Sequence, residues 1–186
     1  MGLFSFLFKR KNQKEEKKKK LFEELNLFIE QIKEKKKIEP IKTDLLLKEG
    51  EEAYLEEKTT LLETRSVRYH STKAVGFRVA RGVYVGIAPG KSESQEEWRA
   101  IDEGIITLTN ERLIFDGSKE ERIIPLRKII SARPLLDSIE ISTENRKKSM
   151  LFTVNNPLIW ATLIHILVKG GDLEKIEDLK VDIVDY

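Results

Sequence analysis

The second half of the chain is a series of short runs in which apolar and polar residues alternate. Ile106 and Leu108 alternate with threonines before Asn110 turns the chain. Leu113 and Phe115 then alternate on the return run. A period of two is typical of strands with one buried face, and tight turns between such runs join the strands antiparallel. The pattern predicts a mainly β fold, either an antiparallel barrel or a curled sheet.

Turn residues set the limits of the other runs. Asp116-Gly117 is expected to reverse the chain. Residues 88–97 contain Pro-Gly followed by polar residues and are expected to form an exposed loop. Further strands are expected at 53–57, 75–79, 83–87, 124–126, 129–130, 138–142 and 150–154.

The last strand leads directly into a helix. Asn156 can cap its first turn, Pro157 can occupy the first helical position, and Gly170 can stop it. The apolar face around Trp160 and Leu167 is so broad that it must be buried against a sheet. The polar residues on the opposite side form one narrow stripe, which is expected to face solvent: Thr162, His165 and Lys169. We therefore predict that this C-terminal helix closes the barrel.

Residues 1–20 join an apolar tip to a lysine run. They carry eight Lys or Arg and two Glu, a net charge of +6, whereas the whole chain carries +2. Consecutive lysines repel one another, so we expect a tail that does not pack. A basic tail of this kind points to an anionic partner, either a lipid surface or nucleic acid.

Residues 21–40 are predicted to form an amphipathic helix, which Pro40 ends. Its apolar residues follow a 4-3-4 spacing and so share one face: Leu21, Leu25, Phe28 and Ile32. The stripe lasts barely two heptads, which is too short for a long coiled coil. We expect the helix either to dock on the body or to pair with a second copy, as a weak homo-oligomer through residues 21–37.

The segment GIITLTNERLIF, Gly104 to Phe115, resembles the GRAM and bacterial PH-like branch of the pleckstrin-homology superfamily. In that branch a glycine begins a strand, a Thr-Asn turn follows, and Arg-Leu-Ile-Phe forms the antiparallel return strand. The usual order continues with Gly117, Ile124-Pro125-Leu126, Ile129, Phe152-x-Val154 and Asn156-Pro157. The resemblance covers Leu47 to Val168, and it is firmest from Asp102 onward.

The resemblance implies a PH-like antiparallel β-barrel capped by a C-terminal helix, over residues 45–169. It also implies binding of a phosphoinositide or a protein, with no catalysis and no cofactor. In PH domains the lipid motif places a Lys, a gap and then Lys/Arg-x-Arg around the first hairpin. Lys73, Arg78 and Arg81 lie in a comparable region. However, Arg78 and Arg81 are three apart instead of two, which departs from the lipid motif.

An acid-free stretch follows Glu63. Between Glu63 and Glu93 lie 29 residues without an Asp or Glu. Cations concentrated on neighbouring strands attract anions, so we expect an anionic-ligand surface here. Its candidate residues are Arg65, Arg68, Lys73, Arg78 and Arg81. The alternative is that the acidic stretch from Glu49 to Glu63 neutralises these cations within the chain.

The N-terminal tip combines apolar area that can insert into a bilayer with cations that an anionic leaflet attracts by ~1 kcal/mol each. The residues expected to contact a membrane are Leu3, Phe4, Phe6, Leu7, Phe8, Lys9, Arg10 and Lys11. The alternative is a disordered tail whose apolar tip folds back onto the body or binds a partner protein. Nucleic acid is a less favoured partner, although Tyr69, Phe77 and Tyr84 interleave with cations as stacking platforms do.

The chain lacks the residues that several kinds of catalytic and metal site require. The chain has no cysteine, so disulfides, thiolate metal sites and cysteine nucleophiles are excluded. His165 lies on the polar helix stripe, His70 has no carboxylate close to it in sequence, and no catalytic or phosphate-cradling motif occurs. The acids that adjoin turns are interpreted as solvated turn residues: Asp102, Glu103 and Asp116. We expect no enzymatic activity, no catalytic residues, no cofactor and no metal site.

No stretch approaches the ~18–20 apolar residues that span a bilayer. The N-terminus also lacks the order of charged and apolar residues of a signal peptide. We therefore expect a cytoplasmic protein that is peripheral at the inner membrane face, with an acidic tail at residues 170–186. It would act as a binding or adaptor protein for a lipid head group or a protein. The alternative is a soluble interaction module that assembles through its N-terminal helix.

Overall fold

The structure of the 186-residue chain is a computed structural model. It describes residues 3–71, 75–80, 83–87, 91–170 and 183, with side chains at 11–66, 96–170 and 183. The chain divides into two compact units, one made of Met1–Glu63 with Ala100–Tyr186 and the other of Thr64–Arg99. Strands β1 (Ala53–Ser71) and β4 (Lys91–Thr109) contribute residues to both units.

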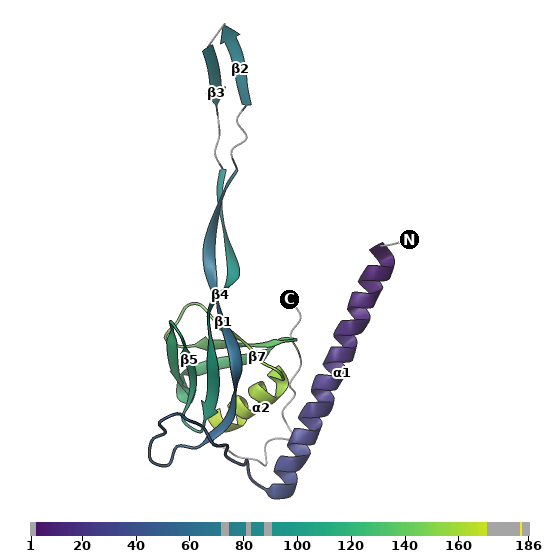
Figure 1. Cartoon of the computed structure of the whole chain (residues 1–186), viewed down its shortest axis with the longest axis vertical. Helices are drawn as coiled ribbons and strands as arrows, with labels where there is room; N and C mark the ends of the chain where they lie inside the picture. The colour runs from purple at the N-terminus through teal and green to yellow at the C-terminus, as the bar shows by residue number, and fades with distance from the viewer. Residues whose placement is uncertain (1–2, 72–74, 81–82, 88–90, 171–182, 184–186) are drawn as a thin grey trace. The chain divides into compact units, whose positions relative to one another are not determined.

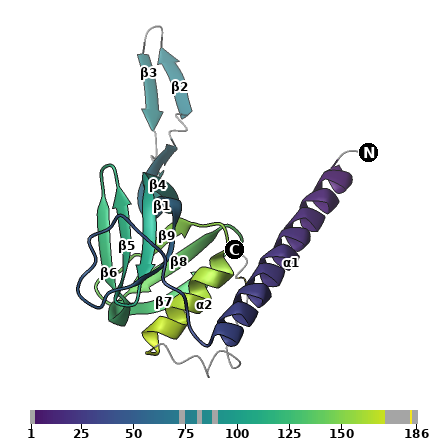
Figure 2. The ribbon, with the colours of Figure 1, turned by 60° about the horizontal axis from the view of Figure 1, so that its bottom comes forward.

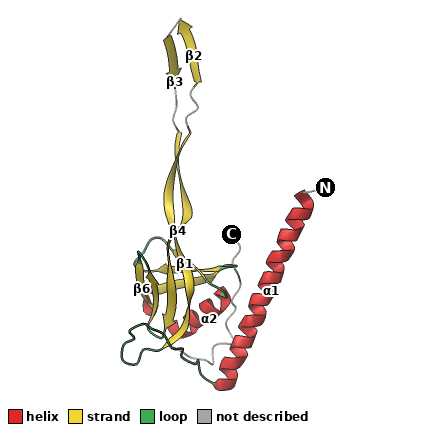
Figure 3. Cartoon of the chain, in the orientation of Figure 1, coloured by secondary structure: helices red, strands yellow, loops and turns green. Residues whose placement is uncertain are grey.

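The first unit is built on an antiparallel sheet of seven strands, part of which Figures 1 and 3 label. The strand order is β6-β5-β4-β1-β9-β8-β7, and Figure 2 labels all seven. A 3₁₀ turn, η1 (Leu126–Lys128), connects its two outermost strands. The remaining strands of this sheet are β5 (Arg112–Gly117), β6 (Glu121–Pro125), β7 (Ile129–Pro134), β8 (Ser138–Thr143) and β9 (Met150–Thr153). The expectation of a mainly β, antiparallel fold with an N-terminal and a C-terminal helix is confirmed.

The hairpin of β4 and β5 has the register that the alternation predicts. Ile106 lies opposite Phe115 and Leu108 lies opposite Leu113, and all four are fully buried. The reversal comes later than expected, because β5 continues through Gly117 and the turn falls on residues 118–120. The core beneath this hairpin is completed by Phe152, whose ring lies 5.8 Å from that of Phe115.

The expectation of an exposed loop over residues 88–97 is wrong from Lys91 onward, where β4 begins. β4 is hydrogen-bonded to β1 in the sheet order. The described residues at the start of β4 include the exposed Glu96, Arg99 and Ala100. A strand that exposes both faces lacks the apolar alternation by which strands are predicted. The polar composition of this part of β4 is therefore typical of a loop, although the segment is a strand.

The second unit contains an antiparallel hairpin of β2 (Val75–Ala80) and β3 (Val83–Ile87). Val75 lies opposite Ile87, and the register shifts between Arg78 and Ala80. The two strands expected from the sequence are therefore present.

The C-terminal helix α2 (Pro157–Val168) begins and ends as predicted. The side chain of Asn156 accepts hydrogen bonds from the backbone N–H groups of Leu158 and Ile159, at 3.1 and 3.3 Å. Gly170 follows the helix with a φ of 85°, a conformation that favours glycine. Trp160 is buried, and its indole N–H donates to Glu57 of β1. The broad apolar face therefore packs against the sheet, as expected.

The polar side of α2 does not face solvent throughout. Thr162 is 1 % exposed, so the expected solvent stripe is wrong at this residue. The reason is that a second helix covers α2: Leu21 and Leu25 of α1 (Leu3–Lys35) pack on Leu158. Thr162 lies one helical turn after Leu158 and so shares its face. Figure 2 shows α2 between the sheet and α1.

Helix α1 includes residues of both predicted N-terminal segments, the tail at residues 1–20 and the amphipathic helix at residues 21–40. It begins at Leu3 and runs through the lysine run, where an unpacked tail was expected. Lysine has a high helix propensity, so repulsion among neighbouring lysines does not break the helix. The helix ends near Lys36, which has a φ of 52°. Within α1, Leu21, Leu25 and Ile32 are buried, so the amphipathic stripe docks on the body of its own chain.

Candidate functional site

The structure does not bring the predicted anionic-ligand residues together as one described surface. Arg65 is exposed on β1. Arg68 lies in β1 and Arg78 in β2, and their side chains lie outside the described part of the structure. Lys73 and Arg81 lie outside the described residues altogether. The anionic-ligand surface therefore stays a prediction.

The predicted membrane-contact residues all belong to α1. Leu3, Phe4, Phe6, Leu7, Phe8, Lys9 and Arg10 are helical, and their side chains lie outside the described part of the structure. Lys11 is exposed. From Lys11 to Lys20 every side chain is exposed except that of Lys18, which is half-buried.

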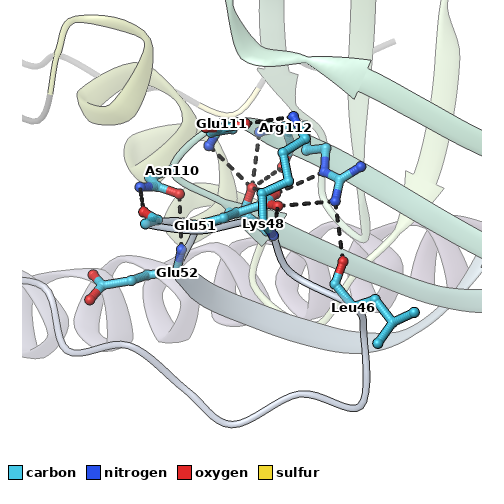
Figure 4. A network of polar contacts seen from close by, with 9 residues as sticks. Leu46, Lys48, Glu51, Glu52, Asn110, Glu111 and Arg112 are labelled. Atoms are coloured by element: carbon cyan, nitrogen blue, oxygen red, sulfur yellow. Dashed lines mark hydrogen bonds and ion pairs between the residues drawn. The ribbon is translucent and has the colours of Figure 1, made fainter.

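A buried carboxylate holds the segment before β1 to the β4–β5 hairpin (Figure 4). Glu51 Oε1 accepts from Arg112 Nε at 2.8 Å, and Glu51 Oε2 accepts from Arg112 Nη2 at 3.0 Å. Thr109 Oγ1 and the backbone N–H of Lys48 also donate to this carboxylate. Burial opposes ionisation of Glu51, but these hydrogen bonds prevail and lower its pKa to about 2.

Neighbouring residues extend this clamp. Lys48 Nζ lies 2.8 Å from Glu111 Oε2, and Asn110 exchanges hydrogen bonds with Gly50 and Glu52 (Figure 4). A hollow of about 450 Å³ lies beside the clamp, lined by Lys48, Asn110, Glu111, Arg112, Ile123, Pro125, Leu126, Arg127, Leu167 and Val168. Lys48 and Arg112 are paired with Glu111 and Glu51, so their part in the clamp is to hold the segment before β1 to the β4–β5 hairpin.

A different carboxylate is shared by two arginines. Glu63, buried on β1, accepts at Oε1 from Arg122 Nη2 at 3.2 Å and from Arg146 Nη2 at 2.9 Å. Arg122 Nη1 also donates to Glu120 Oε2 at 2.7 Å. Arg122 comes from β6 and Arg146 from the turn between β8 and β9, so three separate segments meet here. We call Glu63, Arg122 and Arg146 the Glu63 cluster.

A hollow of about 120 Å³ lies beside the Glu63 cluster. Its lining residues are Arg122, Ile123, Ile124, Pro125, Lys128, Thr143, Asn145, Arg146 and Met150. Arginine and lysine are present in this lining, and aspartate and glutamate are absent from it. Lys128 forms no ion pair with any residue that the structure describes. Arg122 and Arg146 are paired with Glu63 and Glu120, so the positive charge left over at this hollow is that of Lys128, which attracts an anion.

The two arginines that line this hollow do not use all their hydrogen-bond donors on strong acceptors. Arg122 Nε is buried and makes no hydrogen bond within the described residues. Arg146 Nη1 donates to the thioether sulfur of Met150 at 3.3 Å, and a thioether is a weak acceptor. Both guanidinium groups are thus held in place by Glu63 while part of their donor capacity stays unused.

Sequence reasoning did not find these residues. Glu63 is 59 positions from Arg122 and 83 from Arg146. The run Arg146-Lys147-Lys148 in a turn was a visible signal, but nothing in the sequence places it beside β6. Only the sheet order brings these segments together.

The acids near the β5–β6 turn have a structural role. Asp102 is buried and was wrongly interpreted as solvated. It accepts from the backbone N–H groups of Lys119 and Glu120 and from Ser118 Oγ, at 2.6, 2.9 and 2.9 Å. These bonds, led by that of Lys119, lower the pKa of Asp102 to about 2. Asp102 therefore stabilises a turn by local hydrogen bonding.

Within the described residues, no group of three or more His, Cys, Asp or Glu could hold a metal ion. His165 is half-buried, and desolvation followed by the charge of Lys169 lowers its pKa. None of the helices in the described part of the chain is long and apolar enough to cross a membrane. The chain was also compared with known proteins, and no family model, curated protein or solved structure matches it.

Proposed function

We propose that the protein is a non-catalytic adaptor that meets an anionic membrane surface through α1 and binds a lipid head group or a protein with its body. The observation that carries this proposal is the change of exposure along α1. Side chains from Lys11 to Lys20 are exposed or half-buried, whereas Leu21, Leu25 and Ile32 are buried on the body. The docked half fixes the helix, and the lysine-rich half is left for a partner.

The charge of the undocked half suits an anionic leaflet. Residues 11–20 contain six lysines and two glutamates. A lysine near such a leaflet contributes about 1 kcal/mol, and an apolar tip adds a second, insertable signal. The apolar residues from Leu3 to Phe8 precede these lysines in the same helix. Together the two signals support reversible peripheral binding, at the inner face of the membrane in a cytoplasmic protein.

The body is proposed to be a PH-like barrel of the GRAM branch. The sheet order, with β1 between β4 and β9, and helix α2 directly after β9 support this assignment. In that arrangement α2 covers the end of the curled sheet with Trp160, Leu163 and Ile164, all buried. A barrel closed in this way binds through its loops and strand ends, and does not need catalytic residues.

Self-assembly through residues 21–37 is the weaker alternative. Leu21, Leu25 and Ile32 would have to form that interface, but they are buried within their own chain. Leu27 lies on another side of α1 and is 60 % exposed, and it is the one large apolar side chain that is exposed between residues 11 and 35 of this helix. An isolated exposed leucine is common on monomeric proteins.

Vesicle sedimentation tests the membrane proposal. The full chain is mixed with vesicles of phosphatidylcholine alone or with phosphatidylserine added. We expect sedimentation only with the anionic vesicles, and a loss of roughly a hundredfold in affinity when Lys14, Lys17 and Lys19 are replaced by Glu. The matched control replaces Lys37, Lys42 and Lys119 by Glu, which changes the charge equally at exposed sites away from that half of α1.

Two results would contradict the proposal. Equal sedimentation of both triple variants would mean that net charge, and not α1, governs binding. Retention on anionic vesicles after removal of residues 1–11 would show that the apolar tip and the first three cations, Lys9, Arg10 and Lys11, are not needed.

A further inference from the structure

We propose that the hollow beside the Glu63 cluster binds a phosphate monoester group, with Arg122, Lys128 and Arg146 as its cationic ligands. This inference deepens the proposed function, on which it rests, by naming the chemical group that the body would hold. The site differs from the predicted surface after Glu63, because its cations come from β6, η1 and the β8–β9 turn.

The unused donors of the two arginines favour an oxyanion. Arg122 Nε–H is buried and has no acceptor within the described residues. Such a donor is costly to leave unsatisfied, which favours a ligand with acceptor oxygens beside Arg122. Arg146 Nη1 meets only the sulfur of Met150, which lines the same hollow. An oxyanion would replace this weak acceptor by a strong one.

Glu63 prepares the site instead of filling it. By accepting from Arg122 Nη2 and Arg146 Nη2, its carboxylate fixes both guanidinium planes before any ligand arrives. A planar guanidinium held in place loses little freedom when it binds an oxyanion through its remaining N–H groups. Glu63 and Glu120 together balance the charges of the two arginines, so the positive charge left over at the hollow is that of Lys128.

The lining indicates phosphate instead of a carboxylate ligand. A phosphate monoester carries close to two negative charges near neutral pH and presents three acceptor oxygens. Three cationic side chains from separate segments line the hollow, and Thr143 and Asn145 add neutral donors. The apolar part of the lining includes Ile124 and Met150.

The size of the hollow limits what enters it. Its volume of about 120 Å³ is far below the roughly 300–1,000 Å³ of pockets that enclose a whole small molecule. A single phosphate group therefore enters, and the rest of the molecule that carries it stays outside. A lipid head group with a terminal phosphate and free inorganic phosphate share this chemistry.

Titration of the full chain with inorganic phosphate tests the site directly. We expect saturable binding by calorimetry, and chemical shift changes concentrated at Lys128, Thr143, Asn145 and Arg146. The variant Lys128→Gln/Arg146→Gln should weaken binding by about tenfold or more, because it removes two charge-assisted hydrogen-bond donors from the site. The matched control is Arg127→Gln/Lys147→Gln, which removes the same charge from adjacent exposed positions outside the lining and should leave binding within about twofold.

Vesicles then distinguish the two sources of the group. Vesicles of equal surface charge contain either phosphatidylserine or a phosphatidylinositol monophosphate. Tighter binding to the second kind, lost in Lys128→Gln/Arg146→Gln and kept in the control, assigns the site to a lipid head group. If inorganic phosphate binds but the protein does not prefer either kind of vesicle, the site is assigned to a soluble phosphate. The proposed phosphate site is then still supported.

The inference is overturned if inorganic phosphate does not bind, or if Lys128→Gln/Arg146→Gln and the control bind it equally. Thermal melting of both variants verifies that they fold. The α1 variant that replaces Lys14, Lys17 and Lys19 separates the two proposals, because it should lose vesicle binding while phosphate still binds in solution. If the protein does not bind anionic vesicles but still binds inorganic phosphate, the membrane proposal is contradicted and the phosphate site is retained.

Discussion

Gly117 lies so close to the carboxylate of Asp102 that a Cβ at this position would stand 2.4 Å from Oδ2. The same Cβ would lie 2.8 Å from two ring carbons of Phe115. Gly104, which pairs with Gly117 across the β4–β5 ladder, is equally confined, with the carbonyl oxygen of Asp116 at 2.1 Å from its would-be Cβ. The turn between β5 and β6 is thus built around a carboxylate that only glycine admits.

Replacing Gly117 by Ala should destabilise the protein by roughly 1–3 kcal/mol, the usual cost of overpacking a well-packed site. The ring of Phe115 is fully buried and Asp102 is held by the turn, so neither neighbour can move away easily. Urea unfolding followed by tryptophan fluorescence measures the change. Lys119→Ala is the control, because it keeps the backbone N–H that binds Asp102, and it should change stability little. An unchanged midpoint for Gly117→Ala would contradict the tight packing at this turn.

Asp102 should make stability depend on pH in the acid range. Its pKa in the folded protein is about 2, below the ordinary value of 3.8. A lowered folded pKa contributes stability that is present above about pH 4 and is lost as the pH falls toward 2. Asp102→Asn should therefore be less stable than the wild type at pH 6, and the difference should narrow at pH 2.5. Urea unfolding at both pH values measures it, and a constant difference would refute the assignment.

Local patterns predicted the strands and caps because their causes are local. The alternation around Ile106 fixes which face of β4 is buried, and Asn156 caps α2 with its own side chain. The length of α1 and the start of β4 were missed, since both depend on exposed polar residues that carry no apolar pattern. The Glu63 cluster was missed for another reason: its members meet only through the sheet order, which no short segment encodes.

Glu51→Gln should cost about 3–5 kcal/mol, the usual effect of removing one partner of a buried ion pair. The Glu51 side chain is fully buried, and Arg112, which is 16 % exposed, would lose its carboxylate. Because the pKa of Glu51 is lowered to about 2, this contribution too should fade as the pH drops below about 4. The double variant Glu51→Gln/Arg112→Met should recover part of the loss, as it removes the stranded cation. No recovery would mean that the clamp depends on hydrogen bonds to Glu51 other than those of Arg112.

Docking of α1 can be tested with two leucines that differ in burial. Leu25 is 6 % exposed and packs on α2, whereas Leu27, two residues on, is 60 % exposed. Leu25→Ala should cost about 2–5 kcal/mol, because it removes a buried side chain and leaves a cavity between the helices. Leu27→Ala has the same change in helix propensity and side-chain size and should stay within about 0.5 kcal/mol of the wild type.

Hydrogen exchange locates the effect of these two substitutions. If α1 is held by Leu21, Leu25 and Ile32, Leu25→Ala should speed exchange of the amides of residues 21–32 more than those of β5. Thr162 should also exchange faster, since α1 covers its side of α2. Equal protection of residues 21–32 in Leu25→Ala and Leu27→Ala would mean that α1 is a free helix, and the membrane-facing half would then lack the anchor that its proposed role requires.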